Sequence, residues 1–297
     1  MSEPSQTLLR ETPLWRRLEW HFADVRHSDL RDLFDGDPSR GERLAGEAAG
    51  LYFDYSKNLL TDETLELLRK LAVERGVRER VGDLFRSARA GGADDRKALH
   101  LAFRIEHSKT QPQLERMNAL ADEIATGAWV GATGRRIRAV VNIGVGGGHL
   151  GSALVWEALH PRAATGLDCR FVSNVDPDEL AAALSGLEPA ETLFVTLHSG
   201  PGVEQTAVNT AAARSWLRAS LGPKAGLDRH LLAVGFDVTR TSSALEIPRE
   251  NVFSVWAAED GLTSVSSPAG LAVSIALGPA VYRELLAGFR ALDEHFA

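Results

Sequence analysis

The chain has 297 residues, of which 44% are hydrophobic, and it carries a formal net charge of -7. This length and apolar fraction are enough to bury a substantial core, in one large domain or two modest ones. The acidic balance argues against a nucleic-acid partner, because that binding needs a broad basic surface. A small phosphorylated ligand is compatible with it, since such a ligand needs only a local cluster of donors.

Cysteine content and the start of the chain indicate a cytoplasmic protein. Cys169 is the only cysteine, which excludes an internal disulfide and a metal site built from several cysteines. Residues 1–7 have neither the basic nor the apolar segment of a secretion signal. No stretch approaches the roughly 18 uncharged apolar residues of a membrane span. We therefore expect no membrane partner, no metal and no cofactor.

The first part of the chain is predicted to be helical. Residues 64–75 and 97–104 repeat apolar residues at helical spacing, with polar residues between them. The pattern changes near residue 130. We expect a helical N-terminal region over residues 1–130 and an α/β domain over residues 131–297.

After residue 130, short apolar runs alternate with segments long enough to form crossover helices. This alternation is typical of parallel strands that are buried on both faces. It predicts an α/β fold with a doubly wound, mainly parallel, five-stranded sheet. The expected strands cover residues 139–143, 169–172, 193–197, 231–234 and 252–255.

Two helices of this second region have clear sequence boundaries. Asp176 is a suitable cap for a helix that begins at Pro177 and runs to about residue 185. Residues 280–296, which follow Pro279, read as one amphipathic helix. An uncovered apolar face there predicts a homodimer or poor solubility. That face consists of Val281, Leu285, Leu286, Phe289, Leu292 and Phe296.

The first expected strand leads into a glycine-rich turn over residues 144–148. The four glycines there leave backbone without side chains, and ligands of such sheets bind beyond the carboxyl ends of the strands. The turn after residue 197 belongs to the same edge, so the two loops could form one pocket. The spacing fits a tight strand-to-helix turn without a ligand equally well.

Several segments together resemble the N-terminal portion of the phosphoglucose isomerase family, over residues 15–296. The resemblance implies two sugar-isomerase (SIS) domains, of which this chain would hold a helical lead-in and the first. The family interconverts glucose 6-phosphate and fructose 6-phosphate in glycolysis and gluconeogenesis, without a metal. The matching segments are residues 30–34, Asp54-Tyr-Ser-Lys-Asn58, 99–100, 127–134, Asn142-Ile-Gly-Val-Gly-Gly147, 171–174, 191–195 and 292–296.

The chain departs from this family at the positions that the resemblance assigns to substrate. Where the family cradles phosphate with a Ser-Lys-Thr-Phe-Thr-Thr turn, residues 198–203 read His-Ser-Gly-Pro-Gly-Val and differ at every position. The family's Gly-Ser pair reads Gly147-Gly148, and His149 replaces an aspartate. The catalytic arginine falls at Leu262, with Glu259 and Asp260 before it. The glutamate base and ring-opening histidine belong to the second SIS domain, which is absent from this sequence.

These departures leave ligand binding, not catalysis, as the expected role of the loops, and we expect no catalytic residue in this chain. His198 with Ser199 suggests a nucleophile and its base, but no third orienting group is visible, so a structural role is the simpler interpretation. His149 also fits a solvent-facing helix start, and Glu204 a solvated first turn. The candidate ligand-binding residues are Gly146, Gly147, Gly148, His149, His198, Ser199, Gly200, Gly202 and Glu204.

Three functions are compatible with the sequence. The chain is an incomplete or degenerate isomerase that is inactive alone, or a non-catalytic domain that binds a sugar or sugar phosphate. The third hypothesis is half of a split isomerase, which recovers the base and the histidine from a separately encoded second domain. The expected partners are accordingly a sugar or sugar-phosphate ligand and either a second copy or that second domain.

Overall fold

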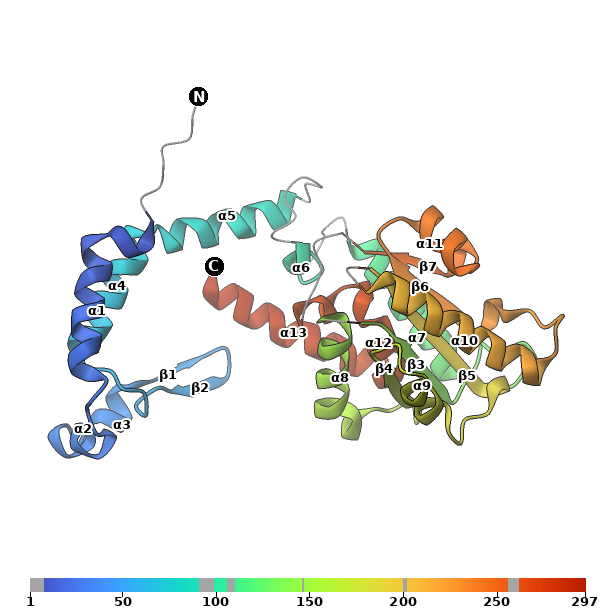
Figure 1. Cartoon of the computed structure of the whole chain (residues 1–297), viewed down its shortest axis with the longest axis horizontal. Helices are drawn as coiled ribbons and strands as arrows, with labels where there is room; N and C mark the ends of the chain where they lie inside the picture. The colour runs from blue at the N-terminus through green and yellow to red at the C-terminus, as the bar shows by residue number, and fades with distance from the viewer. Residues whose placement is uncertain (1–7, 91–98, 106–109, 146, 200–201, 256–261) are drawn as a thin grey trace, which may run out of the picture. The chain divides into compact units, whose positions relative to one another are not determined.

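A computed structural model describes residues 8–90, 99–105, 110–145, 147–199, 202–255 and 262–297 (Figure 1). The chain divides into two compact units, Met1–Phe85 with Ala291–Ala297, and Arg86–Arg290. A boundary at residue 130 stays a prediction. The unit that holds the sheet also includes helix α7 (Gln111–Thr126), which precedes that residue.

The N-terminal unit is mainly helical, and side-chain caps set the starts of two of its long helices. The Thr12 hydroxyl accepts a hydrogen bond from the Trp15 N–H, and Thr61 forms a capping box with Thr64. A short antiparallel pair of strands also occurs here, which the prediction of a helical region did not include. The elements are α1 (Pro13–Val25), α2 (Leu30–Gly36), α3 (Arg40–Arg43), β1 (Ala45–Ala48), β2 (Leu51–Asp54), α4 (Asp62–Glu74) and α5 (Val77–Ala90), whose last residues belong to the second unit.

The segment Asp54-Tyr-Ser-Lys-Asn58 is a structural turn that Arg40 holds in place. The buried Arg40 guanidinium donates to the Ser56 and Asn58 carbonyls, each at 2.8 Å. Asp54 accepts from the Ser56 N–H at 2.8 Å and the Lys57 ammonium at 2.9 Å. These hydrogen bonds hold the pKa of Asp54 far below its usual range. The polar groups of the turn are therefore engaged in hydrogen bonds within the N-terminal unit.

The second unit is built on a five-stranded parallel sheet in the order β4-β3-β5-β6-β7. The chain runs from β3 outward to β4 and then crosses back to β5 on the other side of β3, which makes the sheet doubly wound. The predicted fold class and all five strands are confirmed. They are β3 (Ala139–Ile143), β4 (Asp168–Val172), β5 (Thr192–His198), β6 (Leu231–Gly235) and β7 (Val252–Ser254).

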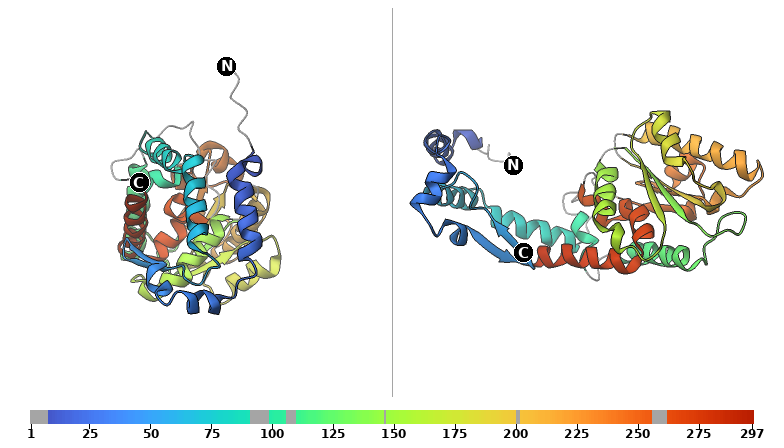
Figure 2. Two further views of the ribbon diagram at one scale, coloured as in Figure 1. Left: turned by 90° about the vertical axis from the view of Figure 1, so that its left-hand side faces the viewer. Right: turned by 90° about the horizontal axis from the view of Figure 1, so that it is seen from below.

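Helices cover both faces of this sheet (Figure 2, right). Buried Val140 and Val195 face one layer, whereas Val141 and Phe194 face the other, because successive strand residues point to opposite sides. Side chains of both helix layers therefore cover the two faces of the sheet. The first layer comprises α7, α12 (Leu271–Leu277) and α13 (Pro279–Phe296), and the second α9 (Pro177–Leu184), α10 (Val203–Leu221) and α11 (Val238–Leu245); α8 (Gly147–Leu159) packs with α12.

The two helices with clear sequence boundaries form as predicted. Asp176 accepts a hydrogen bond from the Asp178 N–H at 2.9 Å and caps α9, which begins at Pro177. On α13, the start of the predicted apolar face is buried, whereas Leu292 and Phe296 are 44% and 63% exposed.

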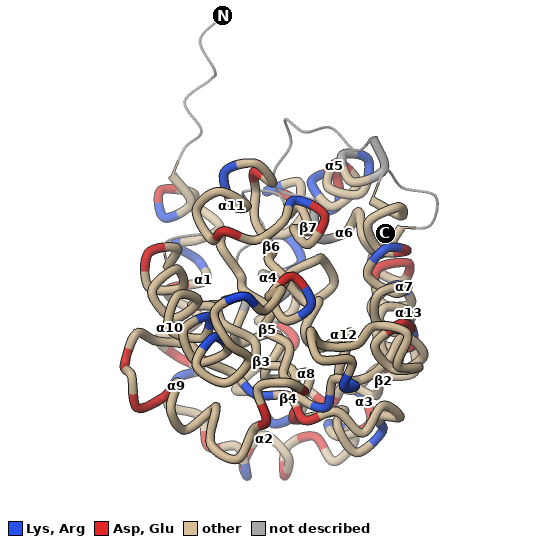
Figure 3. The backbone as a smooth tube through the Cα atoms, turned by 90° about the vertical axis from the view of Figure 1, so that its right-hand side faces the viewer, with Lys and Arg blue, Asp and Glu red and all other residues tan. Residues whose placement is uncertain are grey.

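Acidic and basic residues are interspersed over the sheet unit, as Figure 3 shows. Among the described helices, none is long and apolar enough to cross a membrane.

Candidate functional site

The β3–α8 and β5–α10 loops pack directly against each other at the carboxyl edge of the sheet. A Cβ on Gly202 would lie 2.5 Å from the Val145 Cβ, and one on Gly144 would lie 2.9 Å from the Leu197 Cβ. Side chains at these two glycines would push the loops apart. The loops are therefore neighbours, as the sequence predicted, and glycine is required where they meet.

Three of the candidate residues begin helix α8. Gly147, Gly148 and His149 form its first turn, and Gly146 lies outside the described residues. The His149 ring meets Phe171 edge to face, with centroids 5.6 Å apart. Burial lowers the pKa of His149, so its ring is neutral at physiological pH. Its Nδ1 atom is buried and has no hydrogen-bond partner among the described residues.

The other candidates surround the start of helix α10. His198 is the last residue of β5, Ser199 follows it, and Gly202 occupies the position before the helix. Glu204 is exposed in the first turn, and Gly200 lies outside the described residues. Burial, helped by the charge of an arginine on α11, lowers the pKa of His198. Two neutral imidazoles thus belong to the two adjoining loops.

The position expected for the catalytic arginine, Leu262, begins the first described element after β7 in the sequence. Leu262 begins a 3-10 helix, Leu262–Ser266, and Glu259 and Asp260 lie outside the described residues. An aliphatic side chain carries no charge with which to stabilise an enediolate.

A carboxylate near this edge, Glu179, holds the β4–α9 loop in place. It accepts hydrogen bonds from the Ser173 N–H at 3.1 Å, the Ser173 hydroxyl at 2.8 Å and the Asn174 N–H at 2.8 Å. The sequence marked Asp176 as the cap of the following helix but gave no sign of this clamp. With three donors on its oxygens, Glu179 acts as a positioning group and not as a free base.

Sequence reasoning also missed two residues near this edge, namely Arg240, whose charge acts on His198, and Thr206 in the first turns of α10. Thr206 is buried in the first turns of α10, and its hydroxyl has no partner among the described residues. Thr206 and Thr210 are polar residues four apart on a helix that packs against a buried strand, and this spacing was a usable signal. No local pattern marks Arg240.

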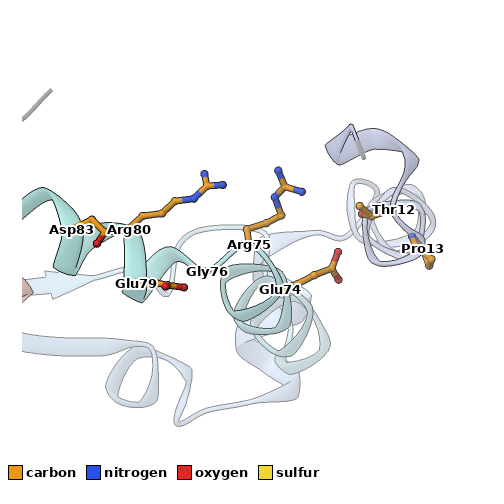
Figure 4. A pocket seen from close by; sticks show the side chains of 8 residues that line it. All are labelled: Thr12, Pro13, Glu74, Arg75, Gly76, Glu79, Arg80 and Asp83. Atoms are coloured by element: carbon orange, nitrogen blue, oxygen red, sulfur yellow. The ribbon is translucent and has the colours of Figure 1, made fainter. Parts of the chain in front are cut away.

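A separate hollow of about 620 Å³ lies within the N-terminal unit (Figure 4). Arg75 and Arg80 extend in the same direction there. Its lining contains both acidic and basic side chains and none of the candidate ligand-binding residues. The hollow is therefore separate from the candidate site at the carboxyl edge of the sheet. The lining residues are Thr12, Pro13, Glu74, Arg75, Gly76, Glu79, Arg80 and Asp83.

The fold and its loops define a doubly wound α/β protein whose topological switch point lies between β3 and β5. The family model for phosphoglucose isomerase matches residues 54–297. The chain belongs to this family, which confirms the resemblance found in the sequence.

Two curated relatives match nearly the whole chain. The glucose-6-phosphate isomerase of Anaeromyxobacter dehalogenans (strain 2CP-C) is 44% identical over 308 residues, covering 100% of this chain and 56% of the relative. That of Roseiflexus castenholzii (strain DSM 13941 / HLO8) is 43% identical over 302 residues, covering 98% and 55%. The chain therefore spans about half the length of the curated relatives it matches.

A solved structure supports the fold. The crystal structure of a glucose-6-phosphate isomerase from Chlamydia trachomatis D/UW-3/Cx superposes with a TM-score of 0.76 at 21% identity. The superposition covers 96% of this chain and 56% of that chain. At this identity the likeness shows the SIS-type fold alone.

Proposed function

We propose that the edge formed by the β3–α8 and β5–α10 loops binds a sugar phosphate, and that this chain alone does not interconvert glucose 6-phosphate and fructose 6-phosphate. The observation that carries the proposal is the close packing of the two loops through Gly202 and Gly144. This packing brings the loops that lead into α8 and α10 side by side at the switch point of the sheet, and His149 and His198 belong to these two segments. Membership of the phosphoglucose isomerase family supports the ligand class.

Binding is supported by the kinds of donors at this edge. The first N–H groups of α8 and α10 have no partner within their helices, and such helix starts favour anions. His149 and His198 are neutral because burial lowers their pKa values, so each ring offers one donor and one acceptor. Neutral imidazoles of this kind suit the hydroxyl groups of a sugar.

The absence of turnover is proposed from what the reaction requires. Proton transfer between C1 and C2 needs a base above these carbons and a cation to stabilise the enediolate. Leu262 stands at the arginine position of the family. Glu179 is engaged by three hydrogen-bond donors, and Glu204 is solvated at a helix start.

A coupled assay tests this proposal together with a melting experiment. The purified chain is given fructose 6-phosphate and a dehydrogenase that reports glucose 6-phosphate, with the Anaeromyxobacter relative as positive control. We expect no turnover above a preparation from cells without the gene. We also expect glucose 6-phosphate to raise the melting temperature, because a ligand bound only by the folded state stabilises it. Turnover that His198→Asn abolishes would overturn the inactive assignment, and an unchanged melting temperature would overturn binding.

A split isomerase is the second candidate, because the chain covers only 56% of a relative that is 44% identical to it. Mixing this chain with the separately expressed remainder of the Anaeromyxobacter relative tests it. Activity in the mixture, absent from either part, would favour complementation. Light scattering of the chain alone tests the homodimer proposed from the exposed Leu292 and Phe296.

A further inference from the structure

A line of polar side chains crosses the interface between β5 and α10. The Thr196 and Thr210 hydroxyl oxygens lie 3.1 Å apart, and Thr210 donates to the Thr206 carbonyl at 2.7 Å. Thr206 is one helical turn before Thr210 on the same face, and His198 is two residues after Thr196 on the same face of the strand. Because α10 begins beyond the end of β5 and runs back along it, Thr206 comes opposite His198.

The Thr206 hydroxyl is available for a partner from outside the described residues. The residue is 1% exposed, and its Oγ1 atom has no hydrogen-bond partner among them. Buried hydroxyl groups in folded proteins are nearly always hydrogen-bonded. We therefore expect the Thr206 hydroxyl to donate a hydrogen bond to an acceptor atom of a ligand bound at this edge.

The third group at this edge is the positively charged side chain of Arg240, on the helix that follows β6. The register of β5 with β6 pairs His198 with Gly235. A Cβ on Gly235 would collide with Thr241, so the first turn of α11 lies directly over the residue paired with His198. Arg240, next to Thr241, is exposed and makes no ion pair with any described residue. The Asp237 carboxylate accepts its backbone N–H at 3.0 Å, as the cap of α11.

We propose that Arg240 binds the anionic group of the ligand at this edge, with the Thr206 hydroxyl and the His198 imidazole as hydrogen-bonding partners. The inference rests on the proposed function and names the residue that selects a phosphorylated sugar over a neutral one. A guanidinium suits this task because it offers paired donors to phosphate oxygens. It supplies, from α11, the charge that the β5–α10 loop lacks where Ser199 replaces the family's lysine. The nearby charge of Arg240 also contributes to the lowered pKa of His198.

The test compares Arg240→Gln with Arg249→Gln. Arg249 is an exposed arginine of the same unit that precedes β7 and so lies at the opposite, amino edge of the sheet. Both variants remove one positive charge, so the net charge of the chain changes equally. Calorimetry measures binding of glucose 6-phosphate, inorganic phosphate and glucose to each variant. We expect Arg240→Gln to weaken glucose 6-phosphate binding roughly tenfold to a hundredfold. The affinity of Arg240→Gln for glucose should equal that of the wild type, and Arg249→Gln should bind glucose 6-phosphate as tightly as the wild type does.

The outcomes separate this inference from the proposed function. Glucose 6-phosphate binding that both variants retain would overturn the role of Arg240 and leave the proposed function standing. Wild-type protein that binds no glucose 6-phosphate would overturn both. Arg240→Lys, which keeps the charge but loses the paired donors, should bind between wild type and Arg240→Gln.

A second measurement does not depend on a ligand. Nuclear magnetic resonance of labelled histidine, assigned with His198→Asn, follows the titration of His198. Its pKa should rise in Arg240→Gln, because a neighbouring positive charge is removed, and stay unchanged in Arg249→Gln. An unchanged pKa of His198 in Arg240→Gln would show that Arg240 does not lie beside His198 and would refute the inference.

Discussion

His230 is the buried ionisable group whose chemistry the structure fixes most tightly. Its ring is fully buried, with Nδ1 2.8 Å from the Thr192 carbonyl oxygen and Nε2 2.9 Å from the Ala132 backbone nitrogen. A carbonyl only accepts and an N–H only donates, so Nδ1 carries the proton and Nε2 accepts. The imidazole is therefore neutral and joins the loop before β3 to the amino end of β5.

The substitution His230→Leu replaces the imidazole by an aliphatic side chain of similar volume. It leaves the Thr192 carbonyl and the Ala132 N–H without their imidazole partner. The buried Thr192 carbonyl left unpaired costs about 1–3 kcal/mol, whereas the N–H of the exposed Ala132 can bind water, so we expect a loss of roughly 1–3 kcal/mol in the free energy of unfolding. In a unit of this size the melting temperature should fall by several degrees. His160→Leu, at an exposed position, is the matched control and should change stability by less than about 0.5 kcal/mol.

The same ring makes stability depend on pH. Burial lowers the pKa of His230 in the folded state, against the opposing effects of the Thr192 hydrogen bond and the Asp228 charge. The unfolded chain, with a histidine pKa of about 6.5, therefore takes up the proton first as the pH falls. This contribution is complete above about pH 6.5 and is lost progressively below it.

Urea denaturation at several pH values between 5 and 8 measures both effects. The wild type should lose stability below about pH 6.5, and His230→Leu should show a shallower slope there. The slope is reduced and not abolished, because burial also lowers the pKa values of His149 and His198. Equal slopes, or a His230→Leu variant as stable as the wild type, would refute this reasoning.

Two further substitutions test the site and the fold. Gly202→Ala should lower the free energy of unfolding by about 1–3 kcal/mol, because its Cβ would meet the Val145 Cβ at 2.5 Å. It should also reduce the rise in melting temperature that glucose 6-phosphate causes. Gly288→Ala, where the added Cβ meets open space, is the control, and equal behaviour of the two variants would contradict the tight loop contact. Asp176→Ala should lower the free energy of unfolding by about 1 kcal/mol through loss of the α9 cap, measured in urea. An unchanged urea midpoint would show that this cap contributes nothing.

Much of the fold could be read from local patterns. The central strands β3, β5 and β6 are buried on both faces and so appear as continuous apolar runs, and α9 is marked by a cap residue followed by a proline. The β1–β2 pair was missed for a physical reason. Leu51, Tyr52 and Phe53 are all more than half exposed, so the strand lacks the alternation that a half-buried strand shows.

The site was only partly predictable. The loops of His149 and His198 could be placed together because the carboxyl ends of parallel strands share one edge. The placement of Thr206 and Arg240 near the end of β5 comes from the packing of α10 against β5 and from the pairing of β5 with β6. These relations arise from tertiary structure, and no spacing along the chain encodes them.

Proton magnetic resonance of glucose 6-phosphate mixed with the purified chain in D2O tests the central claim most directly, because one spectrum series reports binding and proton transfer together. We predict broadened sugar-phosphate signals, with the C2 proton retained and no fructose 6-phosphate formed over hours. Loss of the C2 proton signal with growth of fructose 6-phosphate, in a preparation free of host isomerase, would contradict the account.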